Sequence, residues 1–145
     1  MNYKPSPAFI GSSWAAFAIG FIGFLIGLWN AELPLHEKGY YFVVLMFGLF
    51  AVVSVQKAVR DRQEGIPVTD IYYGICWFST ILALTMLTIG LWNADLWLSE
   101  KGFYAFGFVL ALFGVIAIQK NTRDKMNLDK QIEQQHSKLD FEEEV

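Results

Sequence analysis

The stretch GLWNAELPLHEKG at residues 27–39 returns as GLWNADLWLSEKG at residues 90–102, with the same length and no gap. Extending the comparison to residues 27–61 and 90–124 gives 18 identical residues in 35 aligned positions. Each copy follows a long apolar run and ends in the charged pattern QKxxRD. Self-similarity at a fixed offset indicates a tandem duplication, here of one two-helix unit.

The apolar runs have the length that a lipid bilayer requires. Apolar residues make up 54% of the 145-residue chain and charged residues 17%, below the roughly 25% of a soluble domain. Residues 8–29 and 71–92 carry no charge, and a 22-residue helix spans about 33 Å. The shorter runs at 40–55 and 103–118 are extended by polar residues that reach the interface. None of the four has the polar face of a soluble bundle, so the sequence predicts an all-α membrane protein with four transmembrane helices.

Local signals predict where the helices begin and end. Gly65 followed by Pro67 is a stop signal for the second helix, which we expect from about Glu37 to about Glu64. Thr69 or Asp70 is expected to cap the third helix.

At the start of the fourth helix, Ser99 is expected to act as the cap, with Glu100 in the first turn. The chain then divides into five segments. These are a short cytoplasmic N-terminus at 1–7, a first two-helix hairpin unit at 8–64, a cytoplasmic linker at 65–70, a second hairpin unit at 71–124 and a polar cytoplasmic tail at 125–145. In the tail, Leu128, Ile132 and Leu139 indicate an amphipathic turn or two within a segment otherwise expected to be solvated or disordered.

The duplication and the basic residues predict the topology. Each unit crosses the membrane twice, so both units enter from the same side and form a parallel repeat with a pseudo-two-fold axis along the membrane normal. The hairpin loops hold two Lys or Arg residues and the other side holds nine. Because basic residues concentrate in the cytoplasm, both termini and the linker are expected there.

The two hairpin loops repeat a Trp-Asn pair and a Glu-Lys-Gly triplet. Tryptophan anchors a helix at the interface, asparagine tolerates the left-handed conformation that ends helices, and glutamate favours a helix N-terminus. The glycine would admit a neighbouring backbone. These structural roles compete with a paired binding site. The loop candidates are Trp29, Asn30, Glu37, Lys38, Gly39, Trp92, Asn93, Glu100, Lys101 and Gly102.

The repeated QKxxRD pattern continues the second helix of each unit beyond the membrane. Its Lys and Asp residues are spaced i,i+4 and can pair, and basic residues there also meet anionic lipid. Two interpretations remain, a topological anchor and a docking site for a cytoplasmic partner or lipid headgroup. The candidates are Gln56, Lys57, Arg60, Asp61, Gln119, Lys120, Arg123 and Asp124.

Small residues form strips along three of the helices. Such strips allow membrane helices to approach closely, within one chain or between chains. We favour packing within the chain. The candidates are Ala16, Gly20, Gly23, Gly27, Gly48, Gly107, Ala111 and Gly114.

A duplicated unit that contains GLWNAE and EKGYYF and ends in QKxxRD resembles the YiaA/YiaB family of small bacterial inner-membrane proteins. The length and the duplication favour the YiaA type. The resemblance implies a multi-pass protein of the bacterial inner membrane, with periplasmic hairpin loops in the topology above. It implies no catalytic residue, because the family has no established activity.

The sequence offers little chemistry. We find no nucleophile–base pair, no phosphate loop and no metal-ligand spacing, since Ser99 replaces His36 in the second repeat. Cys76 is expected to be a buried apolar residue, and a net charge of -3 gives no case for nucleic acid. We therefore expect no enzyme, no cofactor and no metal.

The leading hypothesis is a non-enzymatic scaffold, modulator or self-assembling membrane protein. Its partners would be the lipid bilayer and either further copies or another membrane protein. The alternative is a small-molecule or lipid carrier with an aromatic-lined cavity between the hairpins, near Tyr72, Tyr73, Trp77 and Phe78.

Overall fold

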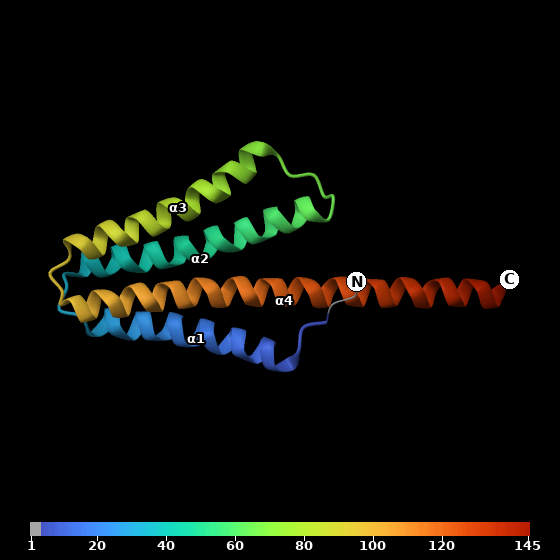
Figure 1. Ribbon diagram of the computed structural model, residues 1–145, viewed down its shortest axis with the longest axis horizontal. Coiled ribbons are helices and arrows are strands. Elements are labelled where there is room, and N and C mark those ends of the chain that lie inside the picture. The colour runs from blue at the N-terminus through green and yellow to red at the C-terminus, as the bar shows by residue number, and fades with distance from the viewer. Residues whose placement is uncertain (1–3) are drawn as a thin grey trace.

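The computed structural model describes residues 4–145, and this range contains four helices: α1 (Pro7–Asn30), α2 (Leu35–Gln63), α3 (Asp70–Asn93) and α4 (Leu98–Glu144). Each is long and apolar enough to cross a membrane. The α1–α2 and α3–α4 loops lie at one end of the bundle, and the α2–α3 linker lies at the other (Figure 1). The predicted all-α membrane fold with four spanning helices is confirmed. Residues 1–3 of the expected N-terminal segment lie outside the described residues.

Two helices begin at a side-chain cap. The Ser6 hydroxyl accepts a hydrogen bond from the Phe9 amide at 3.2 Å, directly before the proline that opens α1. The Thr69 hydroxyl accepts from the Tyr72 amide at 3.3 Å, so Thr69, of the two residues considered, caps α3. These hydroxyls satisfy amides that have no partner inside the helix.

The expected Ser99 cap of α4 is wrong. The helix begins at Leu98, and the Lys101 amide donates to the Trp97 carbonyl at 3.0 Å. Trp97 is therefore the cap residue, without a side-chain hydrogen bond, and Ser99 lies inside the first turn. Pro34 is likewise the cap residue of α2 and makes no side-chain hydrogen bond. α2 begins at Leu35, two residues earlier than expected.

The end of α2 follows the sequence prediction. Gly65 has a φ of 75°, its amide donates to the Arg62 carbonyl, and the Ile66 amide donates to the Asp61 carbonyl at 2.8 Å. This is a Schellman motif, in which the left-handed residue is best supplied by glycine. The predicted glycine stop is confirmed.

The predicted left-handed asparagines are wrong. No residue other than glycine has a positive φ within residues 4–145. Asn30 remains helical and donates from its amide side chain to the Ile26 carbonyl at 2.9 Å, and Asn93 does the same to Ile89 at 2.8 Å. The chain leaves each helix through an extended alanine instead, Ala31 or Ala94.

The helices pack across the two sequence units. α1 packs along α4 and α3 packs along α2, whereas the consecutive helices α1 and α2 meet only sparsely. α2 and α4 contact each other in the middle of the bundle, as Figure 1 shows. Each first helix thus buries its face against the second helix of the other unit, so neither unit is a separate packed hairpin.

Aromatic side chains fill the core between α1, α2 and α4. Phe24, Leu45 and Phe108 are fully buried. Tyr41 and Tyr104, which have equivalent positions in the two repeats, stack with ring centroids 6.4 Å apart. The core is therefore built around repeated positions brought face to face.

Glycines set the distance between α1 and α4. A Cβ added at Gly20 would lie 2.5 Å from the Ala111 nitrogen and 2.7 Å from the Gly107 oxygen. A Cβ at Gly114 would overlap the backbone of Phe17. Both contacts are with backbone atoms, so a larger residue could be accepted only by moving a helix.

The other small residues of the predicted strips have looser neighbours. Gly48 faces Phe108 and Ala83, and Gly27 faces the ring of Phe103, all within the same chain. At Gly23 a Cβ would only touch Phe103, at 4.0 Å. Ala16 is half-buried on α1. The strips therefore lie at contacts between helices of one chain, most closely between α1 and α4.

The tail at 125–145 is helical, where we expected solvated or disordered chain. α4 runs without interruption to Glu144 and projects beyond the other helices (Figure 1). All side chains from residue 131 onward are exposed. Long polar side chains such as Lys, Glu and Gln have high helix propensity, which explains why the helix continues once the membrane-spanning part has nucleated it.

Candidate functional site

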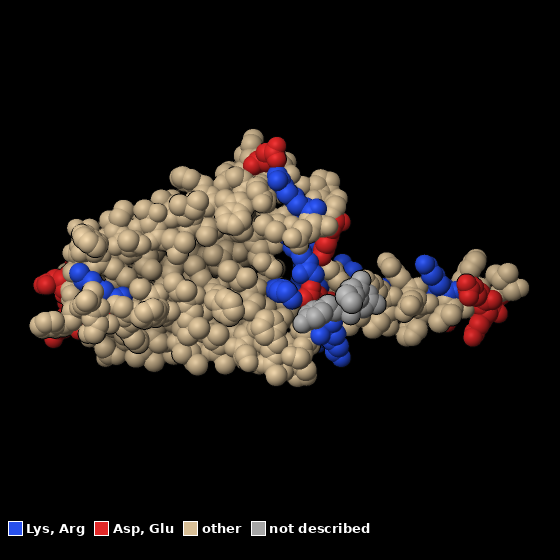
Figure 2. Space-filling view, in the orientation of Figure 1, with Lys and Arg blue, Asp and Glu red and all other residues tan. Residues whose placement is uncertain are grey.

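Charged residues gather at the two ends of the bundle. In the view of Figure 2 the body between the ends is free of red and blue side chains, and further charges lie along the projecting part of α4. This follows from the uncharged runs of the sequence. Each end therefore contains a candidate site, which we call the linker end and the loop end.

At the linker end, the two QKxxRD segments form reciprocal ion pairs between α2 and α4. Arg60 donates to Asp124, and Arg123 donates to Asp61 at 2.5 Å. Asp61 is 5% exposed and Asp124 is 8% exposed. Because each arginine reaches the aspartate of the other repeat, these pairs join the units.

The i,i+4 pairs expected from the sequence are also present. Lys57 pairs with Asp61 at 2.8 Å and Lys120 pairs with Asp124 at 2.9 Å. Each aspartate therefore accepts from one lysine on its own helix and one arginine on the neighbouring helix. Sequence spacing found the first contact and missed the second, whose only signal was that Arg and Asp recur together in both repeats. Gln56 and Gln119 take no part in this network.

Glu64 completes the network at a position where the repeats differ. Its carboxylate accepts from Arg60 at 2.9 Å, from Arg123 at 2.8 Å and from the Asn127 amide at 2.9 Å. Asn127 has the equivalent position in the second repeat. A glutamate at position 127 would place a second carboxylate beside Glu64, and the two negative charges would repel each other. Asn127 instead donates a hydrogen bond to Glu64.

These contacts change the acidity of Glu64. Hydrogen bonds from Arg123 and Arg60 lower the pKa of its carboxyl from 4.5 to about 2. A depressed pKa in the folded state contributes stability above the unfolded value, and that contribution is lost as the pH falls toward the folded value.

We therefore expect the stabilising effect of Glu64 to depend on pH between about 4.5 and about 2. The variant Glu64→Gln should unfold at a lower temperature than the parent at pH 7, and the difference should shrink as the pH falls through this window. Thermal unfolding of the detergent-solubilised chain measures it, with Glu133→Gln, on the exposed part of α4, as the control. A difference that stays constant from pH 7 to pH 2.5 would contradict the assignment.

Arg62 makes a separate contact between α2 and α3 across the linker. Arg62 near the end of α2 donates to Asp70 at 2.7 Å and lies 3.8 Å over the ring of Tyr73. Both partners belong to the first turn of α3. One arginine therefore bridges the two helices that the linker connects.

At the loop end, the equivalent lysines of the two repeats, Lys38 and Lys101, cap the preceding helices. Lys38 donates from Nζ to the Trp29 carbonyl at 3.0 Å, and Lys101 donates to the Trp92 carbonyl at 3.5 Å. A cation at a helix C-terminus is favourable because the last carbonyls lack partners. The two tryptophans are each 82% exposed, as an interfacial anchor requires.

Within residues 4–145 no backbone of another helix lies against Gly39 or Gly102, so the expected close approach is not made inside the chain. A Cβ at Gly39 would meet nothing within 4 Å, and one at Gly102 would meet only Phe106 of its own helix, at 3.9 Å. Each glycine instead lines an apolar groove between the two helices of its unit, of about 710 Å³ and 540 Å³ respectively.

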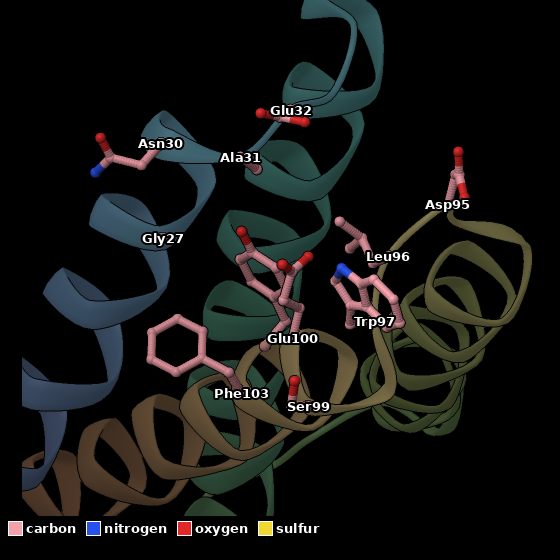
Figure 3. A pocket seen from close by; sticks show the side chains of 11 residues that line it. Gly27, Asn30, Ala31, Glu32, Asp95, Leu96, Trp97, Ser99, Glu100 and Phe103 are labelled. Carbon is pink, nitrogen blue, oxygen red and sulfur yellow. The ribbon is translucent and has the colours of Figure 1, made fainter.

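An open cavity of about 630 Å³ lies between the loops, α1 and the start of α4. Carboxylates reach it from three segments: Glu32 from the first loop, Asp95 from the second and Glu100 from α4. Its aromatic lining comes from Trp97, Phe103 and Tyr104. In Figure 3, Glu100 and Trp97 lie in the middle of the cavity, Glu32 lies above them and Asp95 lies at the rim.

The equivalent positions of the first repeat differ in chemistry. Pro34 stands where the second repeat has Trp97, and Tyr40 stands where it has Phe103. The Tyr40 hydroxyl donates to the Met86 carbonyl at 2.5 Å and so turns toward α3. The repeated sequence therefore forms two unlike environments, and Glu37, the counterpart of Glu100, does not line the 630 Å³ cavity.

The aromatic residues suggested as the lining of a carrier cavity lie at the surface of α3. Tyr72, Trp77 and Phe78 are 42%, 43% and 65% exposed. Tyr73 contacts Arg62 and Trp77. Aromatic residues suit the lipid-facing side of a membrane helix as well as its packed side, because hydrocarbon surrounds the helix.

The remaining candidates offer no metal site. Within residues 4–145 no group of three or more His, Cys, Asp or Glu side chains lies close enough to hold a metal ion. Cys76 is buried on α3, as expected.

Comparisons with known proteins agree with this architecture. A family model described as "yiaA/B two helix domain" matches twice, at residues 9–61 and 72–124. No solved structure matches the chain.

Three relatives carry informative names. The chain is 57% identical over 119 residues to the inner membrane protein YiaA of Escherichia coli K12, covering 82% of each chain. It is 31% identical over 98 residues to the inner membrane protein YiaB of the same organism, covering 68% of this chain and 83% of YiaB. It is 40% identical over 58 residues to the uncharacterized membrane protein YubF of Bacillus subtilis 168, covering 39% of this chain and 67% of YubF.

The two family-model matches coincide with the two repeats, and the four apolar helices make the chain a multi-pass membrane protein. Inner-membrane localisation agrees with the names of the two E. coli relatives. The chain therefore belongs to the YiaA/YiaB two-helix-domain family.

Proposed function

We propose that this protein is a non-enzymatic membrane scaffold that assembles with further copies of itself through the projecting part of α4, residues 128–144. In this proposal the two repeats are parallel, with a pseudo-two-fold axis along the membrane normal, and both termini lie in the cytoplasm. The nine-to-two distribution of Lys and Arg supports that orientation. The observation that carries the proposal is the projecting helix itself.

Within residues 4–145, no hydrogen bond or ion pair joins the projecting part of α4 to another helix. The last hydrogen bond that ties α4 to another helix is the one from Asn127 to Glu64. The 17 residues that follow extend about 26 Å further. A helix of this length is only marginally stable alone in water, and most helices of globular proteins are stabilised by packing an apolar face.

An apolar line follows the helix at heptad spacing. Leu128 falls on a d position and Ile132 and Leu139 fall on successive a positions, and Ile132 and Leu139 are 44% and 57% exposed. Gln135 has the intervening d position. This apolar line is short. A short contact is sufficient for copies that already lie in the same membrane.

Charge complementarity favours a second copy as the partner. Copies inserted in one membrane with the same topology present this helix in parallel. In a parallel pair, Lys138 at a g position faces Glu143 of the other copy at the following e position, and Gln131 faces His136 in the same way. Both contacts are repeated by symmetry, so one sequence stabilises the pair twice.

Cysteine crosslinking in membranes tests this proposal. In a Cys76→Ser background, Ile132→Cys and Leu139→Cys should form disulfide-linked dimers on mild oxidation. The matched control is Ser137→Cys, which is on the same helix but on the opposite, f-position face. Equal crosslinking at all three positions, or a strictly monomeric mass in mild detergent, would overturn the proposal.

A further inference from the structure

We propose that the 630 Å³ cavity at the loop end binds an aliphatic amine that carries more than one ammonium group. This inference concerns the opposite end of the bundle from the projecting helix and does not depend on self-assembly. It is carried by the polar groups of the cavity, by its aromatic lining and by the spacing of its carboxylates.

The charge of the cavity is uncompensated. Glu32, Asp95 and Glu100 line it, and none of them forms an ion pair with any residue of the range 4–145. The nearby loop lysines are occupied elsewhere, because Lys38 and Lys101 donate to the carbonyls that end α1 and α3. All three acidic residues are exposed. Carboxylates without a neighbouring cation attract positively charged ligands.

A tyrosine supplies a further polar group to the same cavity. Tyr104 is only 5% exposed, lines the cavity and makes no hydrogen bond through its hydroxyl to the part of the chain that the structure describes. Because this hydroxyl oxygen is not sealed off from solvent, it is available for a hydrogen bond with a ligand in the cavity.

The available polar atoms are acceptors. The amide nitrogen of Asn30 is occupied by the Ile26 carbonyl, which leaves its side-chain oxygen free for the cavity that Asn30 lines. The carboxylates accept only, and the Tyr104 hydroxyl can accept as well. A matching ligand must therefore donate hydrogen bonds, as an ammonium group does in three directions.

The aromatic lining favours an organic cation. The indole of Trp97 lies next to Glu100 in the middle of the cavity, and the ring of Phe103 extends toward α1 (Figure 3). Ammonium groups are attracted to aromatic faces, most strongly to tryptophan. The methylene chain between two ammonium groups would pack against the same rings and against Leu96.

The spacing of the carboxylates argues against a bare metal ion. A calcium ion requires about six to eight oxygen ligands within about 2.6 Å. Within residues 4–145 no three acidic, His or Cys side chains are close enough to share one ion. Separated carboxylates on two loops and a helix instead suit a ligand whose positive charges are themselves separated by a chain.

Calorimetry tests the proposal. The full chain in mild detergent is titrated with putrescine, a four-carbon diamine. We expect saturable binding, and we expect none with 1,4-butanediol, which has the same chain without charge. Glu100→Gln should weaken putrescine binding about tenfold, the equivalent of one hydrogen bond to a charged group.

The duplication provides a matched control. Glu37→Gln changes the same residue in the first turn of α2, so it reproduces any loss of helix stability, but Glu37 does not line the cavity. It should leave putrescine binding unchanged. Trp97→Leu should weaken binding and Trp97→Phe should restore most of it. Equal affinity for magnesium chloride, an equal loss in both glutamine variants or no saturable binding of putrescine would overturn the proposal.

Discussion

Replacing Gly20 by alanine is expected to destabilise the bundle by about 1–3 kcal/mol, the usual cost of overpacking a well-packed core. The added Cβ would lie 2.5 Å from the Ala111 nitrogen and 2.7 Å from the Gly107 oxygen. No rotation of a side chain relieves a contact with backbone atoms, so α1 must move away from α4. Gly114→Ala should behave similarly, because its Cβ would overlap the backbone of Phe17.

The same helix supplies the control. A Cβ at Gly11 of α1 meets nothing within 4 Å. Alanine is the better helix former, so Gly11→Ala should cost nothing and can stabilise slightly. Gly27→Ala should be intermediate, because its obstacle is the ring of Phe103, which can rotate. Reversible unfolding in mixed detergent gives the order, and a Gly20 variant as stable as the Gly11 variant would show that close helix approach is not required.

Replacing Asp124 by asparagine is expected to cost about 3 kcal/mol, near the lower end of the cost of breaking a buried ion pair. Asp124 is 8% exposed and accepts from Arg60 of α2 and Lys120 of its own helix. Its loss leaves the Arg60 guanidinium, which is also mostly buried, with Glu64 as its remaining carboxylate. We expect a cost near the lower end of this range because the contact of Arg60 with Glu64 remains.

A double substitution separates the ion pair from general packing. Changing both partners, Arg60→Met with Asp124→Leu, removes both mostly buried charges of this pair and leaves Lys120, which is 41% exposed, to be solvated. This double variant should recover much of the lost stability. The control is Asp70→Asn, which removes the carboxylate of the exposed Arg62–Asp70 pair, since Asp70 is 99% exposed. Exposed pairs contribute about 0–1 kcal/mol. If the exposed and buried variants unfolded alike, the network would have no structural role in joining the repeats.

These two predictions concern the same architectural feature. α1 is joined to α4 by glycine contacts, and α2 is joined to α4 by the ion network at the linker end. α4 is therefore the helix that joins α1 and α2, and the same helix projects beyond the bundle. In the proposed assembly, its membrane-spanning part organises the chain and its projecting part joins neighbouring copies.

The repeat does not make the two halves equivalent. Gly20, Gly107 and Gly114 bring α1 close to α4, whereas the corresponding positions of the α3–α2 contact are Ala83, Val44 and Ala51. α1 contacts α4 more extensively than α3 contacts α2, and α3 diverges from α2 toward the linker end (Figure 1). The unequal loop chemistry, with Trp97 on one side and Pro34 on the other, extends this asymmetry to the cavity.

The sequence by itself determined the number of helices, their membrane character and several of their ends. An uncharged run of 22 residues is stable in hydrocarbon as a helix, because each backbone N–H and C=O group then finds its hydrogen-bond partner within the same segment. Gly65 and Thr69 act locally, through backbone conformation and a nearby hydroxyl, so their effects could be predicted without knowing the fold. The i,i+4 pairs of Lys and Asp are local in the same sense.

Only the tertiary structure decided which helices pack together. In lipid the buried and exposed faces of a helix are both apolar, so hydrophobic periodicity does not identify the partner of α1. The pairing of α1 with α4 depends on whether Gly20 and Gly114 find matching backbone, and the contacts of Arg60 with Asp124 and of Arg123 with Asp61 depend on α2 and α4 meeting. Such contacts join residues far apart in the chain, and shape and charge fix them only after the helices have come together.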